Sequence, residues 1–315
     1  MFSIAAYRQL SRFVLNLPIL AIAYLSSNVF AKDQQPAPAD QTEVRTVVMW
    51  QRNFEAPFMH DMVQNILRLS RDKFGPVLLL PSRRMEQGRA FDNLVDKRKV
   101  DLFIGGIDTN REQQAQAIYI PLDRGLLGVR VCLMKKGTRV LTNSKSIDIL
   151  KKNGFSVGTG KHWPDKQIFE HHGIDVVASP TYKNLFSMLA NNRFQCFSRS
   201  LAEVEQEYIK HQKSGIEIDS NLAFVYPFGE FAFVNKEDAE LYRRMKYGLR
   251  KAIEDGSYYR IFNQYYEHNI TQYDLFNRNI IKLENPNLSP EARDSLSKYG
   301  VGNDIFTKKI IHARR

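Results

Sequence analysis

Cysteine is scarce in this chain: only Cys132 and Cys196 occur among its 315 residues. In an oxidising compartment they allow one disulfide, and two buried free thiols are the equal alternative. They do not form the pattern of a zinc-binding or catalytic cysteine site. The glycine and lysine spacing of a phosphate-binding loop is absent as well. We therefore expect no metal and no cofactor.

Acidic residues are missing from the N-terminal segment. Basic residues there precede an uncharged apolar run, 13–25, and the small residue Ala31 stands at an expected cleavage point. Pro18 interrupts the run, which favours a cleaved signal peptide over a permanent membrane helix. No cysteine stands at the cleavage point, so we expect no lipid anchor. The sequence predicts a signal peptide over 1–31, a flexible polar leader over 32–43 and an exported mature chain.

The overall composition is that of an ordinary globular protein, with 43% apolar and 25% charged residues and room for two lobes. The formal net charge is +11, but the basic residues are scattered. They form no regular pattern with aromatic residues, and export also argues against a nucleic-acid partner. The positive charge is compatible with anionic ligands, with anionic membrane surfaces, or with a solvated basic surface that has no such partner.

Five short segments near the start of the predicted globular part alternate between strand and helix patterns. Apolar, β-branched runs predict the strands, and apolar residues on one helical face predict the helices. Strand, helix, strand, helix, strand is the order of a doubly wound parallel sheet. The expected segments are 45–50, 61–73, 77–80, 82–97 and 100–107.

The last of these strands leads through a polar turn to an arginine. Gly105 and Gly106 end the apolar run, residues 108–110 form the turn, and Arg111 follows. A guanidinium group presents a planar fork that makes paired, charge-assisted hydrogen bonds to a carboxylate. Arg111 is therefore a candidate anion anchor, and a surface arginine that caps a loop is the alternative.

This order of strand, glycine, threonine, arginine and crossing strand resembles the middle of the family 3 solute-binding proteins of ABC transporters. Further landmarks of that family follow in order, such as Val234-Asn235-Lys236 after the second crossing, so the resemblance spans 44–267. It implies the type 2 periplasmic-binding fold, an α/β fold of two doubly wound lobes joined by two hinge crossings. The expected parts are lobe 1 over 44–126 and 230–267, lobe 2 over 127–229, and a C-terminal extension over 268–315.

The resemblance also implies which residues face a ligand. Thr109 and Arg111 take the place of the pair that holds the ligand carboxylate in that family. The other candidates lie near the first ligand loop at 51–60, in the turn after a strand at 155–158, and at the end of the segment 192–200. They are Trp50, Phe54, Gly160, Lys161, His162, Trp163, Arg199 and Ser200. For Trp50 and Phe54, core packing is at least an equal alternative, because aromatics commonly fill strand-to-helix corners. For the turn at 159–161 the alternative is a glycine-lysine turn without function.

The segment 192–200 departs from the family where aspartates are expected. Gln195 replaces the first aspartate, the position that would hold the ligand ammonium group falls near Ser200, and Arg199 lies beside it. Losing an anion and gaining a cation disfavours an α-amino acid zwitterion. This fits an acid without an amine or a neutral polar ligand, and since Thr109 and Arg111 are retained we expect a small polar, anionic ligand.

Complementary charges without a reacting group predict a binding protein and no enzyme. We expect a monomeric periplasmic solute-binding protein that serves the permease of an ABC importer. A secreted sensory subunit for a membrane receptor is the alternative. A periplasmic lyase or dehydratase on the same fold is weaker, because His162 with Glu170 or Asp165 is the only suggestive acid–base set. His171 and His172 are adjacent and lack further ligands, so they predict no metal site.

Overall fold

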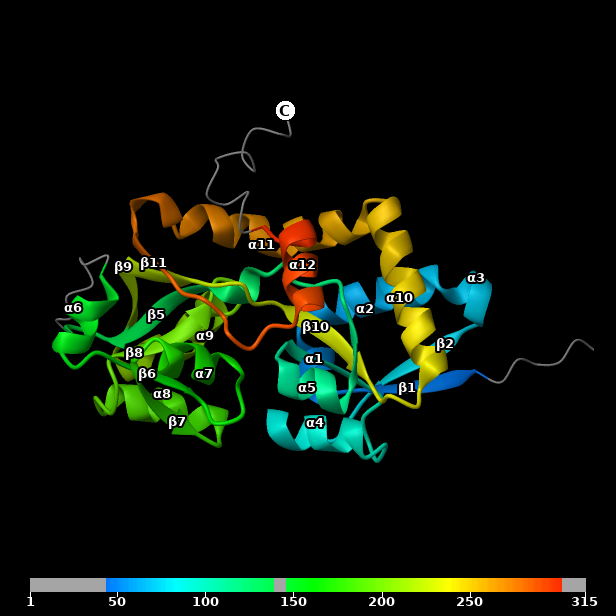
Figure 1. The fold of residues 1–315 in the computed structure, drawn as a ribbon, viewed down its shortest axis with the longest axis horizontal. Helices are drawn as coiled ribbons and strands as arrows, with labels where there is room; N and C mark the ends of the chain where they lie inside the picture. The colour runs from blue at the N-terminus through cyan, green and yellow to red at the C-terminus, as the bar shows by residue number, and fades with distance from the viewer. Residues whose placement is uncertain (1–43, 139–145, 302–315) are drawn as a thin grey trace, which may run out of the picture. The chain divides into compact units, whose positions relative to one another are not determined.

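The computed structural model describes residues 44–138 and 146–301, which build two β-sheets with helices packed on them (Figure 1). The α/β fold class predicted from the sequence is thereby confirmed. The signal peptide and leader predicted over 1–43 lie outside the described residues. No helix of the described part is long and apolar enough to cross a membrane.

The first sheet has the strand order β2-β1-β3-β10-β4. Strands β1, β2 and β3 run parallel, and β10 lies antiparallel between β3 and β4. We call this sheet and its helices the first lobe. The strands are β1 (Arg45–Met49), β2 (Val77–Pro81), β3 (Leu102–Gly106), β4 (Gln116–Ile118) and β10 (Glu230–Val234). The helices are α1 (Gln51–Glu55), α2 (Pro57–Leu69), α3 (Arg71–Phe74), α4 (Gln87–Val95), α5 (Thr109–Gln114), α10 (Ala239–Glu254) and α11 (Ser257–Gln272).

Helices α2 and α10 pack closely against each other in the first lobe. The carboxylate of Asp238 caps α10 by accepting the N–H of Leu241. Leu241 and Leu249 belong to the apolar face of α10 and are fully buried. A Cβ at Gly248 would stand 2.1 Å from the carbonyl oxygen of Ile66 on α2. Glycine is therefore required for this close approach.

The segment 51–60, which the sequence predicted as a ligand loop, is helical. It forms α1 and the start of α2. Pro57 occupies the first position of α2. A backbone N–H at this position would have no acceptor within the helix, so proline loses no hydrogen bond there. The apolar periodicity alone predicted a start at Asp61, whereas helix α2 begins at Pro57.

The second sheet has the strand order β11-β9-β5-β8-β6-β7. A disulfide joins Cys132 on β5 to Cys196 on β8, with their Cα atoms 5.0 Å apart, so the two cysteines are paired and not free. We call this sheet and its helices the second lobe. The strands are β5 (Val129–Lys135), β6 (Ser156–Gly160), β7 (Asp175–Ser179), β8 (Cys196–Ser200), β9 (Ile216–Val225) and β11 (Asn279–Lys282). The helices are α6 (Ile147–Lys152), α7 (Asp165–His171), α8 (Tyr182–Ala190), α9 (Val204–His211) and the 3₁₀ helix η2 (Gln212–Ser214).

The chain passes between the sheets three times, the last time from α11 to β11. We call the other two stretches the crossings: the first runs from β4 through the 3₁₀ helix η1 (Leu126–Gly128) to β5, and the second runs from β9 to β10. The buried carboxylate of Asp123 joins them, because it accepts N–H groups from Gly125 and Leu127 and from Glu230. Burial raises the pKa of Asp123 to about 6, against the effect of these three donors. The lobe limits drawn from the sequence stay predictions.

The chain beyond α11 contributes to both lobes. It forms the 3₁₀ helix η3 (Leu275–Asn277), strand β11 and helix α12 (Pro290–Tyr299). Strand β11 pairs in parallel with β9 at the edge of the second sheet. Helix α12 packs its apolar residues into a core cluster that also contains first-lobe residues, as Phe103 and Phe233 show.

Candidate functional site

A cavity of about 1290 Å³ lies at the ends of strands from both sheets. On the first lobe it is lined by Trp50, which follows β1, and by Ile104 and Gly106 in β3. On the second lobe it is lined by Trp163, which follows β6, and by Arg199 in β8. Ligands of open α/β sheets bind in such crevices beyond the carboxyl ends of the strands. This cavity is therefore the candidate site.

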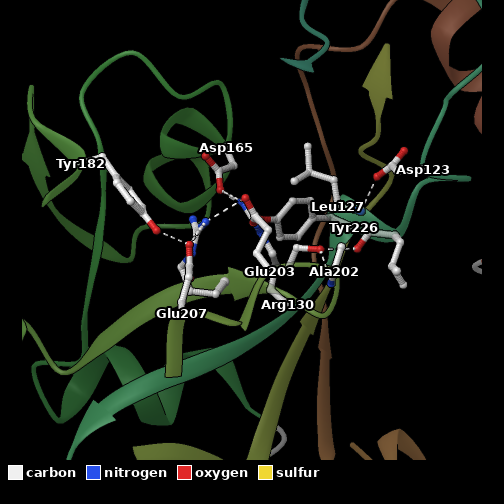
Figure 2. A network of polar contacts seen from close by, with 12 residues as sticks. Asp123, Leu127, Arg130, Asp165, Tyr182, Ala202, Glu203, Glu207 and Tyr226 are labelled. Atoms are coloured by element: carbon white, nitrogen blue, oxygen red, sulfur yellow. Dashed lines mark hydrogen bonds and ion pairs between the residues drawn. The ribbon is translucent and has the colours of Figure 1, made fainter. Parts of the chain in front are cut away.

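Arg130 and Asp165 form a buried ion pair on the second-lobe side of the cavity (Figure 2). Both side chains are only 2% exposed. The Nε of Arg130 donates to the hydroxyl of Tyr226 at 2.9 Å, and its Nη1 donates to Oε2 of Glu203 at 3.5 Å. Burial alone lowers the pKa of Arg130, but Tyr226 and the two carboxylates outweigh it and raise the pKa above its ordinary value. The charge of Arg130 is thus satisfied within the protein.

Arg199 is held by a second network of the same kind. Its Nε and Nη2 donate to the two carboxylate oxygens of Glu207 at 2.5 and 2.7 Å, and Nη2 lies 2.8 Å from Oε1 of Glu203. The hydroxyl of Tyr182 donates to Glu207 at 2.5 Å (Figure 2), and the guanidinium carbon of Arg199 lies 4.8 Å from the ring centre of Trp163. Burial lowers the pKa of Arg199, but Glu203 and Glu207 outweigh it and raise the pKa. Arg199 therefore builds the cavity wall and has no free charge to offer.

The carboxylate of Glu230 differs from these groups, because it has no hydrogen-bond or ion-pair partner within the described chain. Glu230 stands at the start of β10, is partly exposed and lines the cavity. Burial raises the pKa of Glu230 well above its ordinary value, and the negative charges of Asp123 and Glu203 raise it further, against Arg130 and Arg199. A cationic group placed beside Glu230 would favour the ionised carboxylate.

Acidic and basic side chains are balanced in the cavity lining, with seven of each. The basic ones are Arg52, Arg84, Arg89, Arg130, Lys183, Arg199 and Lys210. The acidic ones are Glu55, Glu86, Asp165, Glu203, Glu205, Glu207 and Glu230. Since the two buried arginines are already paired, the lining shows no preference for an anion.

Three of the ten residues predicted to face a ligand line this cavity: Trp50, Trp163 and Arg199. The indole of Trp50 donates to the carbonyl oxygen of Met85 at 3.1 Å, which fixes the ring. A Cβ at Gly160 would lie 2.6 Å from the indole of Trp163. Gly160 therefore acts by making room for Trp163.

Arg111, Lys161 and His162 line a second, smaller cavity of about 280 Å³, which shares Trp163 and Pro164 with the large one. Arg111 is buried, its Nη1 donates to the carbonyl oxygen of Gly106 at 2.6 Å, and its Nη2 donates to Gln87 Oε1 at 3.1 Å and to the His162 carbonyl oxygen at 3.2 Å. Burial lowers the pKa of Arg111 to about 10. In this structure the predicted anion anchor links the first lobe to the backbone of the second and does not line the large cavity.

Thr109, Phe54 and Ser200 line neither of these two cavities. Thr109 is exposed, and its N–H donates to the carbonyl oxygen of Asn287 at 3.0 Å. Phe54 packs edge-on against a neighbouring histidine with ring centres 4.5 Å apart. The hydroxyl of Ser200 donates to the carbonyl oxygen of Leu126 at 3.0 Å. All three make structural contacts here.

The acid–base set considered from the sequence was His162 with Glu170 or Asp165, and both carboxylates are paired with basic side chains instead. Asp165 is paired with Arg130, and Glu170 lies 2.5 Å from the Nζ of Lys166. Within residues 44–138 and 146–301, no group of three or more His, Cys, Asp or Glu side chains could hold a metal ion.

Among the residues of the candidate site that sequence reasoning missed are five that take part in its charge interactions, and two of these carried a signal. Glu203 and Glu207 are four residues apart just after a predicted strand, so a helix there brings both to one face. The other three are Arg130, Tyr182 and Glu230, whose places depend on partners that are distant in the sequence.

Neither protein-family models nor curated proteins give a match to this chain. Among solved structures, an ancestral arginine-binding protein bound to arginine matches with a TM-score of 0.50 and 19% identity, over 71% of this chain and 97% of its own. The fold is that of the periplasmic solute-binding proteins. An arginine-specific periplasmic binding protein from Salmonella typhimurium gives a TM-score of 0.51 and 20% identity, over 71% and 100% of the two chains. A histidine kinase sensor domain similar to periplasmic binding proteins gives 0.50 and 16%, over 71% and 96%. The resemblance predicted from the sequence is confirmed in the fold.

Proposed function

We propose that the protein is a periplasmic solute-binding protein that captures a small polar ligand in the large cavity and serves an ABC importer. The observation that carries this proposal is the position of the cavity, which both lobes line at the two crossings. A ligand held there contacts both lobes, so its binding energy favours the arrangement in which the lobes close on it.

We further propose that the ligand carries a cationic group, in place of the anionic ligand expected from the sequence. The buried arginines of the cavity are paired with carboxylates, whereas the carboxylate of Glu230 is unpaired and partly exposed to the cavity. Two of the matched solved proteins are named for arginine, which agrees with this charge. A basic amino acid is the simplest ligand of this kind.

A thermal-shift screen of the chain from Lys32 onward tests both proposals. The probes are arginine, lysine, glutamine, glutamate, succinate and glucose. A ligand that binds only the native state stabilises it by RT ln(1 + [L]/Kd), about 2.7 kcal/mol at a hundredfold excess over Kd. We expect arginine or lysine to raise the melting temperature. A shift with glutamate or succinate alone would contradict the cationic ligand, and no shift with any probe would count against the binding function.

A sensory role is the second candidate, because one of the matched structures is the sensor domain of a histidine kinase. The ligand site would be the same, and only the membrane partner would differ. The neighbouring genes distinguish the two roles. A permease and an ATPase beside this gene favour import, and a receptor kinase without them favours sensing.

A further inference from the structure

The segment 279–301, which we call the C-terminal brace, begins on the second lobe. Its first element, β11, extends the second sheet by pairing with β9 from Asn279 opposite Leu222 to Lys282 opposite Val225. The N–H of Leu283 continues this pairing by donating to the carbonyl oxygen of Val225 at 2.9 Å. The start of the brace is therefore part of the second-lobe sheet.

The other end of the brace is packed on the first lobe. On α12, Ala292 and Leu296 are buried in the cluster that contains Phe103 of β3. The hydroxyl of Ser295 donates to the carbonyl oxygen of Tyr119 at 2.8 Å, beyond the end of β4. The brace thus passes from one lobe to the other outside the two crossings.

Helix α12 and the residues after it lie directly on the two crossings, which form the hinge of the proposed binding protein. Leu296 stands so close to both crossings that a Cβ at Gly125 or at Gly229 would lie 3.2 or 2.9 Å from its Cδ2. The N–H of Val301 donates to the carbonyl oxygen of Arg124 at 2.8 Å. The hinge is therefore covered by α12 at the point where Asp123 joins the two crossings.

Asn287 connects the brace to both lobes at once. Its carbonyl oxygen accepts the N–H of Thr109 at 3.0 Å on the first lobe, and its Nδ2 donates to Oε1 of Gln167 at 2.7 Å on the second. Nearby, Arg111 makes its own bond from the first lobe to the carbonyl oxygen of His162. Opening of the hinge would have to break these bonds or strain the brace.

We infer that the C-terminal brace is a further connection between the lobes, besides the two crossings and the link from α11 to β11, and that it limits how far the hinge opens. A binding protein whose lobes are held near the binding arrangement loses less affinity to unproductive conformers, because apparent affinity falls with the fraction of molecules that are competent to bind. The inference concerns the ligand-free protein and does not depend on the identity of the ligand.

Distances between spin labels test the inference on the full-length chain without ligand. Both native cysteines are in the disulfide, so labels at Gln64→Cys on α2 and Ser187→Cys on α8, both exposed sites, report the lobe separation. Leu296→Asp places a charge in the contact of α12 with the hinge. We expect the distance distribution to broaden and shift to longer values. The control is Ser297→Asp, the same new side chain at the adjacent exposed position, which should leave the distribution unchanged.

A second variant keeps the test decisive if Leu296→Asp unfolds the protein. Six glycine and serine residues inserted after Pro286 lengthen the connection between β11 and α12 by up to about 20 Å while leaving both elements their contacts. The lobe separation should again become longer and broader, with circular dichroism unchanged. An unaltered distribution in this folded insertion variant would overturn the inference.

Discussion

Three buried arginines near the two cavities are satisfied in opposite ways. In the second lobe, Arg130 and Arg199 are bonded to carboxylates, which raise their pKa values against the effect of burial. In the first lobe, Arg111 is bonded to two carbonyl oxygens and an amide oxygen, and burial lowers its pKa. A buried guanidinium is therefore no sign of an anion site in itself. Its partners decide whether it builds the wall, joins the lobes or binds a ligand.

The largest expected effect comes from breaking a second-lobe pair. Asp165→Ala leaves Arg130 buried without its principal carboxylate, so we expect a loss of about 3–5 kcal/mol in the free energy of unfolding. Urea unfolding followed by fluorescence measures it. The matched control is Glu170→Ala on the same helix, whose partly exposed pair with Lys166 should contribute less than about 1 kcal/mol. Equal losses in the two variants would contradict the account of the buried pair.

Asp123, the buried carboxylate that joins the two crossings, predicts a pH dependence of stability. The pKa of Asp123 rises from 3.8 to about 6 on folding. Because the folded-state value is the higher one, its contribution to stability is complete below about pH 4 and is lost as the pH rises through 6. We expect Asp123 alone to lower the free energy of unfolding by about 2–3 kcal/mol between pH 4 and pH 8, and its neighbour Glu230, whose pKa burial also raises, to lower it further.

The comparison with Asp123→Asn isolates this contribution, because other groups titrate in the same range. Urea unfolding of both proteins at several pH values should show a difference that changes with pH in the stated direction. A difference that is constant from pH 4 to pH 8 would contradict the raised pKa of Asp123.

Arg111→Ala is expected to have a smaller effect on stability, of about 2 kcal/mol. The change removes the bonds to Gly106, Gln87 and His162, but it leaves no buried charge unpaired. Thermal unfolding of the ligand-free variant measures the loss. If Arg111→Ala lowered the free energy of unfolding as much as Asp165→Ala, Arg111 would contribute more to stability than these hydrogen bonds to neutral groups.

The fold could be predicted because its signals are local. The apolar runs that become β1, β2 and β3, and the apolar faces of α2 and α10, each specify their own element. The pairing of β11 with β9 has no such signal, because it joins residues near 280 to residues near 223. Local patterns therefore predicted elements of the first lobe, the family resemblance implied the two-lobe arrangement, and neither offered a role for the brace.

The candidate site could be predicted only in part. Trp50 and Trp163 line the cavity. They could be predicted because each follows a strand that the sequence pattern indicates. The environment of Arg111 depends on the backbone of His162, 51 residues away, and Thr109 is engaged by Asn287 in the brace. Such distant partners decide whether a polar side chain is free to bind a ligand, and periodicity carries no information about them.

The ligand affinities of two variants test the central claim most directly. Calorimetric titration with arginine should show a loss of about tenfold in affinity, or about 1.4 kcal/mol, for Glu230→Gln, because the neutral amide cannot pair with a cationic group. Arg111→Ala should retain arginine binding, because Arg111 does not line the large cavity. The reverse pattern, with affinity lost in Arg111→Ala and kept in Glu230→Gln, would contradict the claim and place the ligand at Arg111.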